Sequence, residues 1–141
     1  MKSGWYGDIY FVVKPLCNGH RQSLIMGAQH YSGPHWAILM GVFSSNISYE
    51  SMIGSRVWRV PTSTNKNPSI KVLSVALEAL KEIEQEIHQR ANGKRAYIHV
   101  DGMNEKRLRV YTKVLTKKCG YKKSSAKSQC VDGFHQIYKR V

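Results

Sequence analysis

Residues 68–102 read PSIKVLSVALEALKEIEQEIHQRANGKRAYIHVDG, and this stretch decides the fold. In its first part, apolar residues recur every three or four positions, the spacing of one face of an α-helix; they are Ile70, Leu73, Leu77, Leu80, Ile83 and Ile87. Asn67 and Pro68 suit the helix start, and Asn92-Gly93 suits its end. The pattern predicts a long amphipathic helix packed on a sheet.

The sequence after this helix predicts a strand, a second helix and two more strands, over 95–100, 104–118, 121–125 and 134–140. Upstream, short β-branched and aromatic runs broken by turn residues predict strands near 9–13, 23–30, 36–43 and 56–60, with a loop or one helical turn at 48–53. A strand, helix, strand unit implies a right-handed parallel crossover. We therefore predict an α/β (α+β) fold with a mixed, mostly antiparallel sheet.

The size and composition of the chain favour one soluble domain. A chain of 141 residues is near the commonest domain size, and we expect a single domain over 1–141. Its three cysteines are an odd number, which disfavours a disulfide framework. No stretch approaches the ~20 apolar residues of a membrane helix, and no secretory apolar region precedes the first cysteine. These features predict a cytoplasmic protein without a membrane partner.

The formal net charge of +13 is the extreme value of this composition. A positive field of this size favours polyanions such as nucleic acid, although many basic proteins only carry solvated basic faces. Eleven of the 22 basic residues fall between Lys106 and Arg140. Candidate nucleic-acid contacts are Lys106, Arg107, Arg109, Lys113, Lys117, Lys118, Lys122 and Lys123.

The order of elements, with Asn104, Tyr111 and the Gly120-Tyr121 pair, resembles the GNAT superfamily of N-acetyltransferases over about the last 85 residues. In that family an Asn opens the last helix and a Tyr seven residues later faces the cofactor sulfur. The resemblance implies acetyl-CoA or a related acyl-CoA as cofactor, an amine acceptor, and Tyr111 as the acid that protonates the departing thiolate. Judged from residues alone, Tyr111 is instead a core aromatic.

The resemblance also implies that the loop before the long helix binds the pyrophosphate, at the helix N-terminus. This stretch contains no glycine, and its candidate cofactor-binding residues, joined by Asn104, are Thr62, Ser63, Thr64, Asn65, Lys66 and Ser69. The loop and the basic charge together also resemble, more loosely, phage DNA-modifying relatives of the superfamily. The alternative prediction is therefore a nucleic-acid-binding or DNA-modifying protein on a GNAT-like scaffold, with weak or no acetyltransferase activity.

Three other patterns are weaker predictors of function. Cys17 and His20 have the spacing of half a zinc site, but a structural zinc normally needs two such pairs, so no metal is predicted. A strand that ends in Asp101 is similar to the ribonuclease H layout, although the clustered carboxylates needed for two metal ions are missing. The aromatic segment 30–36 offers an acceptor or base-stacking surface, or else ordinary core residues, the reading we favour.

Overall fold

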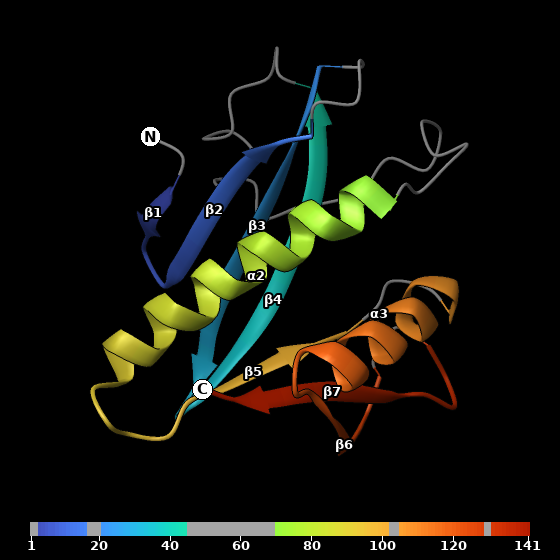
Figure 1. Cartoon of the computed structure of the whole chain (residues 1–141). Coiled ribbons are helices and arrows are strands. Elements are labelled where there is room, and N and C mark those ends of the chain that lie inside the picture. Colours follow the sequence, from blue (N-terminus) through green and yellow to red (C-terminus); the bar gives the residue numbers. More distant parts are fainter. Residues whose placement is uncertain (1–2, 17–20, 45–69, 102–104, 129–130) are drawn as a thin grey trace.

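The computed structural model describes residues 3–16, 21–44, 70–101, 105–128 and 131–141. Within them lie two helices, α2 (Ile70–Ala91) and α3 (Glu105–Lys118). The strands are β1 (Ser3–Tyr6), β2 (Ile9–Pro15), β3 (Gln22–Ser32), β4 (His35–Ser44), β5 (Tyr97–Val100), β6 (Lys122–Lys127) and β7 (His135–Arg140). They form one sheet in the order β1-β2-β3-β4-β5-β7-β6 (Figure 1).

The sheet is mixed, as the sequence predicts. β1 to β4 pair antiparallel in chain order, and β7 pairs antiparallel with both β5 and β6. β4 and β5 are parallel, because α2 carries the chain from one to the other. The predicted strand at 56–60 and the loop at 48–53 lie outside the described residues, and β1 is a strand that the sequence analysis did not predict.

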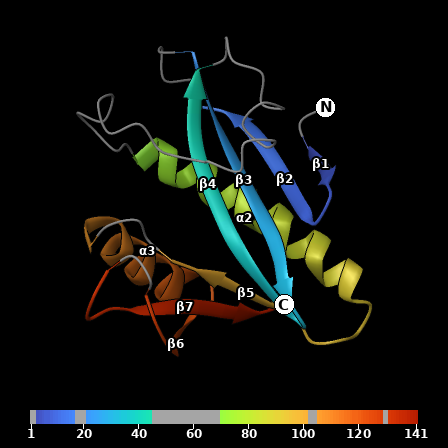
Figure 2. The same cartoon turned by 180° about the vertical axis from the view of Figure 1, so that it is seen from behind.

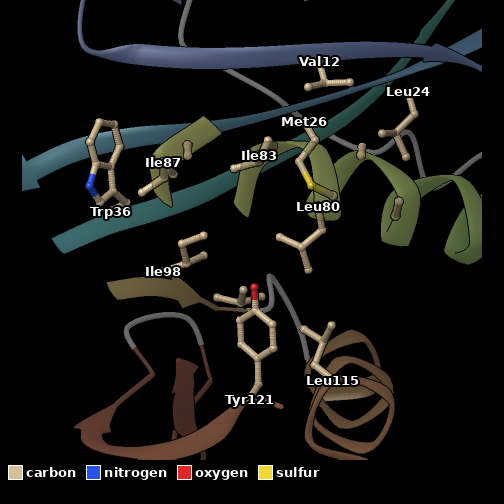
Figure 3. Packing of buried hydrophobic residues seen from close by; sticks show 14 of the residues in the cluster. Val12, Leu24, Met26, Trp36, Leu80, Ile83, Ile87, Ile98, Leu115 and Tyr121 are labelled. Atoms are coloured by element: carbon tan, nitrogen blue, oxygen red, sulfur yellow. The ribbon is translucent and has the colours of Figure 1, made fainter. Parts of the chain in front are cut away.

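Both helices pack on the same face of the sheet, where the main core lies. The apolar side of α2 supplies Leu80, Ile83 and Ile87, as its periodicity predicts. Val12, Met26 and other residues of β2 to β4 contact these side chains from the sheet. Leu115 of α3 belongs to the same cluster, as do Ile98 and Tyr121 (Figure 3). Burial of these side chains, at roughly 1.5–3 kcal/mol each, is the main stabilising contribution.

Polar contacts fix α2 to the second half of the sheet. The Tyr121 hydroxyl donates to Glu84 Oε2 at 2.8 Å, and Lys139 Nζ lies 3.1 Å from Glu84 Oε1. Tyr121 stands directly after Gly120, whose φ of 80° ends α3 in a left-handed turn that a side chain rarely adopts. In that turn the amide of Tyr121 donates to the Leu115 carbonyl.

The opposite face, which we call the open face, is not covered by α2 or α3 (Figure 2). Residues paired directly across neighbouring strands point to the same face. Over β2 to β4 the open face carries a buried aliphatic and aromatic cluster, namely Ile9, Phe11, Val13, Ile25 and Phe43. Over the start of β4, β5 and β7 it carries tyrosine and histidine rings instead.

Candidate functional site: a cavity where β4 and β5 diverge

β4 and β5 pair only at their beginnings and then diverge. Their parallel register runs from His35↔Tyr97 to Ala37↔His99, whereas β4 continues to Ser44 beside β3. Both views of the ribbon show the two strands separating from the region near the C-terminus (Figures 1 and 2). Beyond Ala37, the backbone groups on this edge of β4 have no strand partner among the described residues.

A cavity of about 590 Å³ lies at this divergence. Its wall contains Ala37 to Met40 of β4, His99 and Val100 of β5, and Asp101 directly after β5. Apolar side chains of the two helices, such as Leu77, Leu80 and Val114, close it on the helix side, and Tyr31 lies at its open-face side. This volume and largely apolar lining suit a small-molecule site.

Tyr111 is the predicted catalytic residue that the structure places at this cavity. It projects from α3, is partly buried, and both lines the cavity and packs against the main core cluster. Tyr111 therefore fits both interpretations of the sequence, because it is a cavity residue and also a core aromatic. The other predicted cofactor residues, Thr62, Ser63, Thr64, Asn65, Lys66, Ser69 and Asn104, lie outside the described residues.

His99 is a cavity residue that the sequence analysis missed. Its Nε2 lies 2.9 Å from Nδ1 of His35, on the neighbouring strand. Its own Nδ1 is buried without a hydrogen-bond partner in the described structure. Burial, and secondarily the charge of His35, lowers the pKa of His99 from its ordinary value of 6.5. The ring therefore remains neutral and able to accept a proton near neutral pH.

Three tyrosine rings surround this histidine pair on the open face. We call the five rings together the ring platform; they are Tyr31, His35, Tyr97, His99 and Tyr138. Tyr31 stacks on His35 with centroids 5.8 Å apart, and His35 stacks on Tyr97 at 5.5 Å. His99 stacks on Tyr138 at 6.0 Å and contacts Tyr31 at 6.0 Å. Tyr97, His35 and Tyr31 thus form a row of rings, and Tyr31, which is 53% exposed, is its outermost ring.

The sequence contained a signal for part of this platform. The run 97–100 reads Tyr, Ile, His, Val, and its alternation directs Tyr97 and His99 to one face and the two aliphatic residues to the core. The sequence analysis interpreted the run only as a buried strand. It grouped Trp36 with His30, Tyr31 and His35, but Trp36 is a core residue at 8% exposure on the helix-covered face.

The predicted nucleic-acid residues do not form one surface. The α3 members Lys106, Arg109, Lys113, Lys117 and Lys118 are exposed on a helix that covers the other face, and Arg107 belongs to the same helix. Lys122 and Lys123 lie on β6, where Lys122 pairs with Tyr138 and therefore shares the face of the ring platform. Arg140 pairs with Tyr97 and lies on that face too, which places two basic residues beside the rings.

Within the described residues, the remaining sequence patterns do not add a catalytic centre. Asp101 lines the cavity and accepts a hydrogen bond from the Ser128 hydroxyl at 2.6 Å, so it anchors the loop before β7. Cys17 and His20 lie outside the described residues, and no metal-binding group of three or more side chains occurs within the described ones. Neither described helix is long and apolar enough to cross a membrane.

No protein-family model, characterised protein or solved structure matches this chain.

Proposed function

We propose that this protein is an acyltransferase of the GNAT type, which uses acetyl-CoA or a related acyl thioester to modify an amine. The cavity between the diverging parallel strands is the observation that carries the proposal. The edge of β4 beyond Ala37, which has no strand partner among the described residues, suits the amides of a pantetheine chain, and the apolar wall suits its methylene groups. The element order and the residues Asn104 and Tyr111 support the same assignment.

The side chains at the cavity fit the proton transfers of such a reaction. A bound thioester supplies the activated acyl group that the amine attacks. His99 is neutral near neutral pH because burial lowers its pKa, and its ring at the cavity is the candidate acceptor of the proton that the amine loses. Tyr111, on the α3 side of the same cavity, is the candidate donor of a proton to the departing sulfur. The largely apolar lining offers few hydrogen-bond partners to water, which competes with the amine for the acyl group.

Calorimetric titration with acetyl-CoA tests the binding step. We expect saturable binding by the wild-type protein and none by Ile38→Trp, because Ile38 lines the cavity and a larger ring fills it. Val110→Trp is the matched control, since Val110 lies on α3 at 43% exposure and its replacement leaves the cavity open. Equal binding by a folded Ile38→Trp protein, or no binding by the wild type, would refute the assignment.

Release of free thiol from acetyl-CoA, in the presence of a panel of primary amines, tests the chemical step. Tyr111→Phe retains the ring that packs against the core but removes the hydroxyl, so we expect unchanged acetyl-CoA binding and roughly 100-fold slower thiol release. A variant with wild-type turnover would exclude Tyr111 as the acid. A variant that fails to fold would show that the hydroxyl serves the core instead.

A further inference from the structure

We infer that the ring platform, together with Lys122 and Arg140, binds single-stranded nucleic acid by stacking unpaired bases. The inference concerns the open face of the sheet and does not rest on the proposed acyl transfer. The sequence placed the basic nucleic-acid contacts mainly on α3, and it named segment 30–36 as a base-stacking surface or, the reading favoured there, as core residues.

The arrangement of the rings provides the stacking surface. Tyr97, His35 and Tyr31 form a row in which neighbouring ring planes differ by 26° and 21°. The row ends at Tyr31, which has His35 on one side and is half exposed to solvent. An unpaired base that stacks on Tyr31 continues this row, because any base offers a π-face whatever its sequence. The second stacked pair, His99 and Tyr138, lies next to it.

Several classes of ligand bind to aromatic rings, and the charge of the molecule indicates which class binds here. Neutral sugars and organic cations also stack on such rings, but the net charge of +13 repels cations and offers nothing to neutral sugars. A polyanion gains from that field, and the cross-strand pairs Lys122↔Tyr138 and Arg140↔Tyr97 put cationic groups on the face that carries the rings. Rings for bases and cations for phosphates are the two elements of single-strand recognition.

Fluorescence anisotropy with a labelled 15-nucleotide oligothymidylate tests the inference. We expect binding whose affinity falls with rising salt, and weaker binding to a duplex of equal length, because paired bases are not free to stack. Tyr31→Ala should weaken binding by roughly fivefold to 150-fold, the range of one lost base contact. Tyr31→Phe retains the ring and should bind like the wild type.

The chain offers matched controls for both kinds of contact. Tyr6 is 49% exposed on β1, which β2 separates from the strand that carries Tyr31, so Tyr6→Ala controls for loss of an exposed tyrosine. Arg109→Gln on α3 and Arg140→Gln on the platform face change the net charge equally, and only the second should weaken binding clearly.

Equal effects of Tyr31→Ala and Tyr6→Ala would overturn the inference and leave the rings as cross-strand pairs that stabilise the sheet. The inference would also be overturned if the two arginine variants had equal effects, or if duplex bound as tightly as single strand. The absence of binding by the wild type would overturn it as well.

Discussion

The Glu84 carboxylate connects α2 to β7 and to the start of β6, and its removal should destabilise the fold. Glu84→Ala leaves the Tyr121 hydroxyl, on a residue only 2% exposed, without its acceptor and leaves the Lys139 ammonium without its partner. Breaking a buried pair costs about 3–5 kcal/mol, and an unsatisfied buried hydroxyl costs about 1–3 kcal/mol. Because the Glu84 and Lys139 side chains remain 15% and 30% exposed, we expect a loss of about 3 kcal/mol.

Urea unfolding at neutral pH measures this loss, with Glu82→Ala as control. Glu82 lies on the same helix and pairs with Lys14 of β2 at 2.9 Å, but its side chain is 48% exposed, so its removal should cost under about 1 kcal/mol. Tyr121→Phe should cost about 1 kcal/mol, since Glu84 then retains Lys139. If Glu84→Ala and Glu82→Ala lose equal free energies of unfolding, the argument from burial is wrong.

Two further predictions concern local features of the fold. The pKa of His99 is lowered from 6.5 in the folded state, so as pH falls below that value the unfolded chain takes up the proton first and the protein loses stability. The urea midpoint of His99→Gln should therefore fall less between pH 7 and 5 than that of the wild type. An equal fall in both proteins would show that His99 is not the source of the pH dependence. Gly120 has a φ of 80°, so Gly120→Ala should lower the thermal midpoint through a loss of about 1 kcal/mol of stability. At a position of ordinary backbone geometry, the same replacement would stabilise the chain. A gain in stability for Gly120→Ala would show that the turn rearranges.

Local patterns in the sequence were sufficient for the elements themselves. The three-and-four-residue spacing from Ile70 to Ile87 predicted α2, because one face of a helix must be apolar to pack on a sheet. The change of period before α2 predicted strands upstream of it, and the strand, helix, strand order predicted a parallel crossover in a mixed sheet. The structure has that parallel contact between β4 and β5, whereas the strand predicted directly before the helix, 56–60, lies outside the described residues. β1 was missed because Ser3–Tyr6 is short and carries no apolar alternation.

The candidate sites depended on contacts that the sequence does not encode locally. How far β4 and β5 stay paired depends on long-range packing that no local pattern encodes, so only the tertiary structure showed that pairing stops at Ala37 and that a cavity follows. His35 and His99, and likewise Glu84, Tyr121 and Lys139, are far apart along the chain and meet only through strand register and helix docking. The sequence by itself thus determined the type and order of the described elements other than β1, because those follow from periodicity. The tertiary structure alone decided which side chains share a cavity or a face, because sheet register and layer packing are long-range properties.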